Sequence, residues 1–194
     1  AGYAPAQFYV VAAWFKVFGE TLGAERLYDL LVRLGIVLLV YVIVSSMATR
    51  NAGILAGAFT TVRLTLIEYA LYPVYPAMLA CLAATSLLIT YFRSEDQKRL
   101  WLVGVALGAA GCFRQDLGVY AAIAAAFTVV AFSLLKERER PISARLLLLI
   151  QSLSLVGIGG LIVLGPLYGY FLWNVGPQLL WYNLVSVPLF VSQN

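Results

Sequence analysis

The sequence predicts an all-α protein: a polytopic bundle of about six transmembrane helices with one interfacial helix at its amino-terminal end. The 194 residues are 62% hydrophobic and 11% charged, whereas soluble domains carry about 25% charged residues. The apolar residues form runs of about the 20 residues that a helix needs to cross a bilayer. The charges fall in short segments between these runs, so we predict an integral membrane protein.

The amino-terminal segment, Tyr3 to Phe18, is aromatic and amphipathic, and Pro5 stands where a helix would begin. Polar residues near its ends, such as Lys16, make it a poor membrane span. We predict that residues 1–23 form a helix in the membrane interface, with its aromatic side chains at headgroup level, followed by a turn.

Residues 24–173 contain six apolar runs, which are separated by polar residues or by prolines that interrupt helices. The predicted spans are Leu27–Met47, Ala52–Tyr72, Val74–Phe92, Leu100–Phe113, Leu117–Leu135 and Leu146–Leu164. The last span is expected to bend or break at Gly165-Pro166 before continuing to Trp173. Residues 174–194 mix aromatic residues, glycine and proline, and are predicted to form an interfacial segment at the outer face.

Two of the predicted spans contain charged residues. Asp29 and Arg33 are four residues apart and can pair on one helix face, with the Arg33 side chain extending toward the interface. Arg63 and Glu68 lie in the second half of the next span. An arginine this deep needs a partner or water, so we expect that helix to end early or to face a cavity.

Basic residues divide unequally between the two ends of the predicted helices. One end holds Arg50, Arg93, Lys98, Arg99, Lys136, Arg138, Arg140 and Arg145. The other holds Lys16, Arg26, Arg33 and Arg114, with Arg63 unassigned. Because the richer end faces the cytoplasm by the positive-inside rule, both ends of the chain and Arg114 are predicted to face away from it.

Composition also excludes several kinds of site. The chain has no histidine, which removes histidine bases, haem ligation and most zinc sites. Cys81 and Cys112 lie in apolar runs without metal or redox spacing, so free buried thiols are predicted and a disulfide is the alternative. No cofactor or metal site is predicted, although a divalent metal stays possible. The net charge of +4 resides in short loops, so we expect no nucleic-acid partner.

Three glycine pairs have the small-xxx-small spacing that lets membrane helices approach closely. They are Gly53 with Gly57, Gly104 with Gly108, and Gly165 with Gly169. We expect them to pack helices within one bundle, and the alternative is that they form a homodimer.

The polar triplet Arg114-Gln115-Asp116 lies between two apolar runs. Because charges are costly inside a bilayer, we predict a tight turn at a membrane face. Arg114 either pairs with Asp116 to cap the adjacent helices or binds a phosphate, for which the guanidinium fork is well shaped. Arg63 has the same alternatives, as a residue that extends to the interface or as a second cation. Glu68 either neutralises Arg63 or acts as a base.

Several segments resemble the GT-C glycosyltransferases, which include protein O-mannosyltransferases, aminoarabinose lipid A transferases and many bacterial relatives. Tyr3 to Gly19 resembles their proline-led aromatic interface helix, and Glu25-Arg26-Leu27 fits the opening of the next span. Gly104 to Gly118 is similar to a glycine-rich stretch that ends in Arg-Gln-Asp in the bacterial members. Trp181 to Pro188 resembles a segment that follows their later helices.

The resemblance implies an enzyme of the bacterial cytoplasmic membrane that uses a polyprenyl-phosphate sugar as donor. Transfer to an acceptor lipid, glycan or protein would occur on the extracytoplasmic face with inversion. Arg114, Gln115 and Arg63 are then candidates for binding the donor phosphate, with Asp116, Glu68 and Tyr3 in support. The lipid A transferases have Glu-Lys where Tyr3-Ala4 stand here, so their phosphate-binding lysine has no counterpart.

The same resemblance implies that the catalytic aspartate lies before Ala1. Residues 1–194 are therefore expected to be part of the transmembrane domain of a longer protein. Two other classes of function remain open at this stage. A secondary transporter would also use a broken helix and an intramembrane arginine. A non-catalytic membrane scaffold would use Arg114 only as a structural cap.

Overall fold

The computed structural model describes residues 6–66, 71–136 and 142–182, and within these ranges the chain is entirely helices and their connections. The helices are α1 (Ala6–Phe18), α2 (Leu22–Met47), α3 (Arg50–Thr65), α4 (Val74–Ser94), α5 (Lys98–Phe113), α6 (Gln115–Lys136), α7 (Ile142–Val175) and α8 (Pro177–Trp181). The prediction of an all-α bundle, with α1 as a separate amino-terminal helix, is confirmed.

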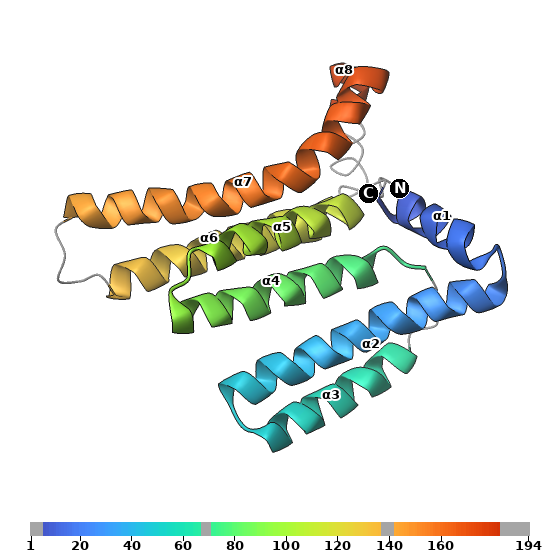
Figure 1. Ribbon diagram of the computed structural model, residues 1–194, viewed down its shortest axis with the longest axis horizontal. Coiled ribbons are helices and arrows are strands. Elements are labelled where there is room, and N and C mark those ends of the chain that lie inside the picture. Colours follow the sequence, from blue (N-terminus) through green and yellow to red (C-terminus); the bar gives the residue numbers. More distant parts are fainter. Residues whose placement is uncertain (1–5, 67–70, 137–141, 183–194) are drawn as a thin grey trace, which may run out of the picture.

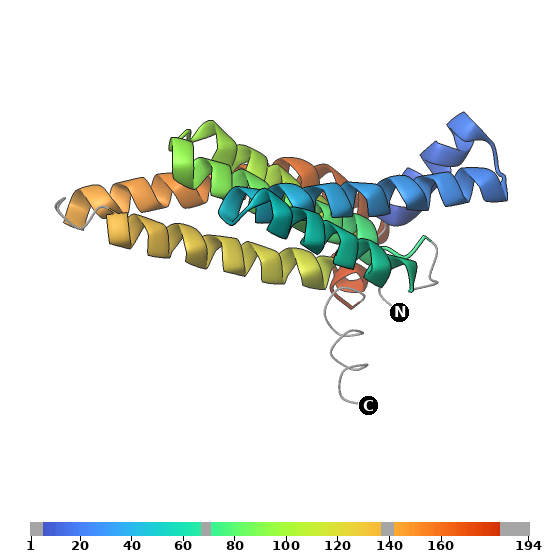
Figure 2. The same ribbon diagram turned by 90° about the horizontal axis from the view of Figure 1, so that it is seen from below.

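Helices α2 to α7 run back and forth along one direction, so their connections gather at two ends (Figure 1). We call one the Arg114 end; it holds the start of α2, the end of α3, the start of α4, the α5–α6 turn and the end of α7. We call the other the Lys98 end; it holds the α2–α3 and α4–α5 turns and the start of α7. Seen from below, α1 also lies at the Arg114 end (Figure 2).

Two hydrophobic clusters hold the bundle together. The larger surrounds α5, where Leu100 and Val103 are completely buried beside Val129 of α6. The smaller joins α2, α3 and α4 through Ile36, Leu64 and Tyr75. Because α4 contributes to both clusters, it connects the α2–α3 pair to the rest of the bundle.

Backbone contact at glycines explains two of the small-xxx-small pairs. A Cβ atom on Gly104 would lie 2.1 Å from the Val156 carbonyl oxygen of α7, and one on Gly53 would lie 1.9 Å from Ser45 Oγ of α2. These glycines therefore pack helices within the bundle, as predicted. A Cβ on Gly165 or Gly169 would meet no atom within 4 Å, so the third pair packs against no helix in the described part of the chain.

The predicted spans correspond to six helices, but the helices differ in length. Among the described residues, four are long and apolar enough to cross a membrane: α2, α4, α6 and most of α7. Helices α3 and α5 have 16 residues each, which gives about 24 Å at 1.5 Å per residue, less than the roughly 30 Å hydrocarbon core. The structure thus shows an integral membrane bundle, and six complete spans remain a prediction.

Pro166 does not break its helix, which corrects one of the two expectations for Gly165-Pro166. Helix α7 is continuous from Ile142 to Val175 and has Pro166 inside it, although its last turns bend away from α5 in Figure 1. Proline is tolerated in membrane helices because local adjustments satisfy the backbone groups that it frees. The chain therefore bends in this region without interrupting the helix.

Other local predictions agree with the structure. Helix α3 ends at Thr65, which confirms the early end expected near Arg63. Cys81 and Cys112 are free thiols. The carboxyl-terminal part of the predicted interfacial segment, residues 183–194, lies outside the described residues.

Candidate polar site at the Arg114 end

The α5–α6 turn is as tight as the sequence predicted, because two glycines let the helices touch. A Cβ atom on Gly118 would lie only 2.4 Å from the Cα atom of Gly111. Helix α5 ends at Phe113 and α6 begins at Gln115, so Arg114 alone connects them. Its extended backbone donates to the Ala110 carbonyl at 2.8 Å.

The Arg114 side chain is held in place from two sides. Its Nε donates to both carboxylate oxygens of Asp116, at 2.8 and 3.0 Å, and its Nη1 donates to the Tyr72 hydroxyl at 3.4 Å. The hydrogen bond to Asp116 raises the pKa of Arg114 above its already high ordinary value, so the guanidinium stays charged. The side chain is 32% exposed, and no described residue hydrogen-bonds its Nη2 atom. One edge of the fork is thus available to a ligand.

Tyr72 belongs to the connection that enters α4, and this connection is fixed by α1. Leu71 adopts a left-handed φ of 53°, a conformation that costs a leucine roughly 1–2 kcal/mol. The buried Gln7 side chain donates to the Leu71 carbonyl oxygen at 3.0 Å. Tyr75 then donates its backbone N–H to the Tyr72 carbonyl at 3.1 Å. The hydroxyl that contacts Arg114 is therefore carried by a connection that Gln7 of α1 also holds.

A second arginine–aspartate pair lies on the α2 side of the same connection. Arg33 Nε is 2.7 Å from Asp29 Oδ2, and the two side chains are only 17% and 16% exposed. Arg33 also donates to the Leu64 carbonyl at the end of α3, and its guanidinium carbon lies 4.8 Å from the centroid of the Tyr75 ring. The predicted pairing is confirmed, but the side chain turns into the bundle instead of extending freely toward the interface.

The Tyr75 hydroxyl is unusual within this cluster. Tyr75 is 5% exposed, and its hydroxyl is buried with no hydrogen-bond partner among the described residues. Buried polar groups normally have a partner, because an unsatisfied group costs about 1–3 kcal/mol. Among the described residues, the Tyr75 hydroxyl at the Arg114 end therefore has hydrogen-bonding capacity that is not used.

An apolar groove of about 450 Å³ runs from the α5–α6 turn along the surface of α5, between α6 and α7. Six of its lining residues are glycines, so much of its wall is backbone with no side chain projecting from it. The polar side chains in its lining are those of Gln115 and Tyr168. The lining residues are Gly104, Leu107, Gly108, Gly111, Gln115, Gly118, Val119, Ala122, Val156, Gly157, Gly160, Leu161, Leu164 and Tyr168.

The structure brings together only part of the predicted set. Arg114, Gln115 and Asp116 share one turn, with Gln115 at the groove. Arg63 is exposed in the last turn of α3, and none of the described contacts joins it to Arg114. Glu68 and Tyr3 lie outside the described residues.

Tyr72, Tyr75 and Gln7 were missed by the sequence analysis. The Tyr72-Pro73-Val74-Tyr75-Pro76 pattern could have indicated the two tyrosines, because residues that are both polar and aromatic lie here at a predicted helix break. Gln7 gave none, since its partner is 64 positions away. No three His, Cys, Asp or Glu side chains gather as metal ligands in the described part of the chain.

Four apolar helices and a polar cluster confined to one end of the bundle define a polytopic integral membrane protein. The family profile for dolichyl-phosphate-mannose-protein mannosyltransferase matches residues 3–163. The chain belongs to this family of membrane glycosyltransferases, in agreement with the resemblance seen in the sequence. No curated protein and no solved structure matches the chain.

Proposed function

We propose that this chain forms the donor-binding part of a membrane glycosyltransferase that uses a polyprenyl-phosphate sugar. The sugar would pass to an acceptor on the extracytoplasmic face of the bacterial cytoplasmic membrane. The observation that carries the proposal is that the turn bearing the charged Arg114 also carries Gln115, which lines an apolar groove. A lipid-linked sugar has the matching chemistry, since its phosphate joins a long apolar chain to a polar sugar.

The groove suits the chain of such a donor. Its wall is made by α5, α6 and α7, and Val119 of α6 and Leu161 of α7 expose much of their side chains to the bundle exterior. A lipid can therefore enter sideways from the bilayer without opening the bundle. The glycine-lined floor gives an isoprenoid chain close contact with the α5 backbone.

The phosphate would lie at the α5–α6 turn. Arg114 keeps its position through Asp116 and Tyr72 while presenting Nη2, and Gln115 supplies amide donors at the groove. Fixed donors of this kind stabilise the negative charge that develops on a leaving phosphate. The held geometry avoids reorganisation when the bond to the sugar breaks.

Two described aspartates at this end, Asp29 and Asp116, do not offer a good general base. Asp29 and Asp116 are both held by arginine side chains, and a base must be free to accept the proton of the acceptor hydroxyl. We propose that this role belongs to a carboxylate elsewhere in the protein, before Ala1 as the resemblance implies. Glu68, outside the described residues, is the alternative within this chain.

Direct binding of a radiolabelled polyprenyl-phosphate sugar to the purified protein tests the proposal. Arg114→Gln removes a charged hydrogen-bond donor and is expected to weaken binding about tenfold to a hundredfold. Arg50→Gln removes the same charge from an exposed position at the Lys98 end and should leave binding unchanged. Equal affinities for wild type and Arg114→Gln would contradict the assignment of the phosphate site.

The transporter alternative has lost one of its supporting features. Transporter sites use helices that are broken near the middle of the membrane, and α7 continues through Pro166. Arg63, the other feature, is exposed near the end of a short helix. The glycosyltransferase proposal is therefore the better supported one.

A further inference from the structure

A second cavity lies at the Lys98 end, away from the α5–α6 turn. Its volume is about 470 Å³, and it is formed where the start of α5 meets α7. Its lining comprises Gln97, Lys98, Trp101, Leu102, Gln151 and Leu155. Most of these side chains are exposed, so the cavity opens to the outside of the bundle.

The cavity has a polar part and an apolar part. The Gln151 amide donates to the Gln97 side-chain oxygen at 3.0 Å, which ties α7 to the entrance of α5. Trp101 and Leu102 lie about one helical turn further along α5, and Leu155 lies one turn beyond Gln151 on α7. A ligand that filled the cavity would thus need a polar head and an apolar continuation.

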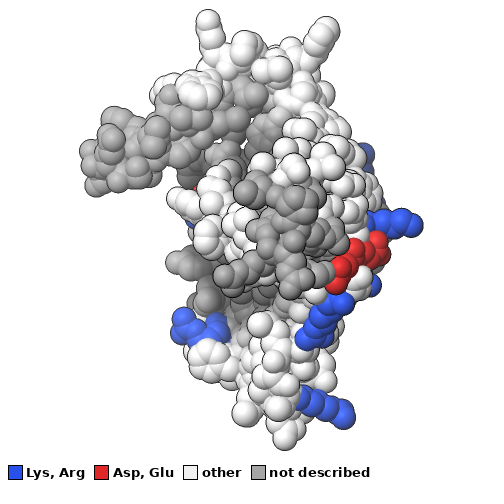
Figure 3. Space-filling view, turned by 90° about the vertical axis from the view of Figure 1, so that its left-hand side faces the viewer, with Lys and Arg blue, Asp and Glu red and all other residues white. Residues whose placement is uncertain are grey.

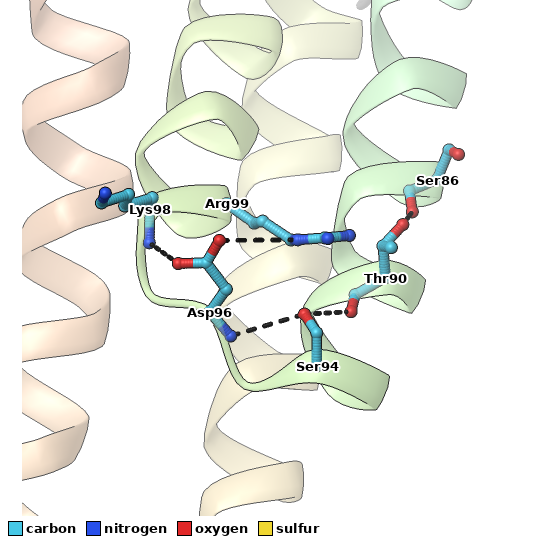
Figure 4. Close-up of polar contacts among 6 residues, drawn as sticks. All are labelled: Ser86, Thr90, Ser94, Asp96, Lys98 and Arg99. Atoms are coloured by element: carbon cyan, nitrogen blue, oxygen red, sulfur yellow. Dashed lines mark hydrogen bonds and ion pairs between the residues drawn. The ribbon is translucent and has the colours of Figure 1, made fainter.

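Lys98 gives the polar part a positive charge. Its backbone N–H donates to Asp96 Oδ1 at 3.1 Å, but its side chain points away from Asp96 and toward α7 (Figure 4). No carboxylate of a described residue lies within 4.0 Å of its ammonium group. Asp96 instead faces Arg99, whose Nε is 3.9 Å from Oδ2.

The surroundings are also basic. The described cations at this end are Arg50, Arg93, Lys98 and Arg99, and the described acids are Glu95 and Asp96. Viewed end-on, basic side chains lie above and below an acidic patch near one edge of the molecule (Figure 3). An anionic head is therefore favoured over a cationic or neutral one.

We propose that this cavity binds one anionic phospholipid. Lys98 contacts the headgroup phosphate, and the Gln97–Gln151 pair hydrogen-bonds the glycerol or ester oxygens. Trp101, Leu102 and Leu155 contact the first methylene groups of an acyl chain. Tryptophan is favoured at this depth because its ring is apolar and its N–H is polar. The site is distinct from the donor groove and does not depend on the proposed transferase activity.

Native mass spectrometry of the detergent-purified protein, titrated with phosphatidylglycerol or phosphatidylcholine, tests this proposal. We expect one phosphatidylglycerol to bind about five times more tightly than phosphatidylcholine, the contribution of one basic residue near anionic lipid. Lys98→Gln should abolish this preference, and Lys98→Arg should retain it. Arg50→Gln removes an equal charge at the same end, outside the cavity, and should also retain it.

Three results would overturn the proposal. The preference could survive in Lys98→Gln, or it could fall equally in Arg50→Gln, which would indicate general charge attraction. Soluble glycerol phosphate could compete as well as the intact lipid, which would show that the apolar part of the cavity is not used. Thermal unfolding of each variant verifies that it is folded, and Lys98 is exposed enough for its replacement to leave the bundle intact.

Discussion

The two ends of the bundle use charge differently. At the Arg114 end, Arg33 and Asp29 are 2.7 Å apart and less than one fifth exposed, and Arg114 is held by both Asp116 and Tyr72. At the Lys98 end, Arg99 and Asp96 are 3.9 Å apart, with side chains 32% and 47% exposed. The first end therefore has positioned charges, whereas the second has solvated charges of the kind that set membrane orientation.

This difference has an energetic consequence. Ion pairs in water contribute little, because solvent screens them and ordering long side chains costs entropy. A pair removed from water depends on its partner, since removing one member leaves the other charge uncompensated. Equivalent substitutions should therefore have large effects at the Arg114 end and small effects at the Lys98 end.

The largest effect is expected for Arg33→Met. It leaves Asp29 without its partner and removes the donor to the Leu64 carbonyl, so we expect a loss of about 3 kcal/mol in the free energy of unfolding. Denaturation in detergent micelles measures this loss. The double variant with Asp29→Leu should recover much of the stability, because no charge is then left alone. A loss below about 0.5 kcal/mol for Arg33→Met would remove the distinction between the ends.

Arg114→Gln should have a smaller effect on stability than on ligand binding. Its pair with Asp116 is partly exposed, so we expect a loss of about 1 kcal/mol in the free energy of unfolding. Parallel measurements of unfolding and donor binding separate a structural cap from a ligand contact. A large loss of stability with unchanged binding would favour the cap.

Tyr75→Phe should be neutral or stabilising by up to about 0.5 kcal/mol, since it removes a buried hydroxyl that has no described partner. Tyr28→Phe is the matched control, because the Tyr28 hydroxyl donates to Gln7 Oε1 at 3.4 Å in the same region. The control should cost about 1 kcal/mol in unfolding free energy. An equal loss for both would mean that the Tyr75 hydroxyl is satisfied.

Arg99→Gln should have the smallest effect, within about 0.5 kcal/mol of zero, because its pair is long and exposed. The same denaturation assay applies. A loss comparable to that of Arg33→Met would show that the Lys98 end is also organised by buried charge.

The sequence predicted those features that depend on neighbours along the chain. The α5–α6 turn was predictable because three polar residues interrupt two apolar runs, and the Asp29–Arg33 pair because residues four apart share a helix face. The early end of α3 followed from the cost of an arginine in lipid. Family membership followed from the order of short motifs, although each is only modestly specific.

Features set by tertiary contacts were not predictable in this way. The left-handed Leu71, the contact of Gln7 with its carbonyl and the buried Tyr75 hydroxyl all depend on how α1 and α2 meet α4. The groove depends on the separation of α6 from α7, which no local pattern reports. Whether Pro166 would bend or break its helix was also left open by the sequence, because the local chemistry of proline disfavours a helix whereas a membrane helix accommodates it.

Photo-crosslinking tests the central claim, that the Arg114 end binds the lipid-linked donor. The probe is a polyprenyl phosphate that carries a diazirine on the isoprene unit nearest the phosphate, with the labelled peptides identified by mass spectrometry. We expect labelling within residues 104–122 and 156–168, competed by unlabelled polyprenyl phosphate and reduced in Arg114→Gln. Labelling at the Lys98 end, or labelling of the groove that the unlabelled lipid does not compete, would contradict the claim.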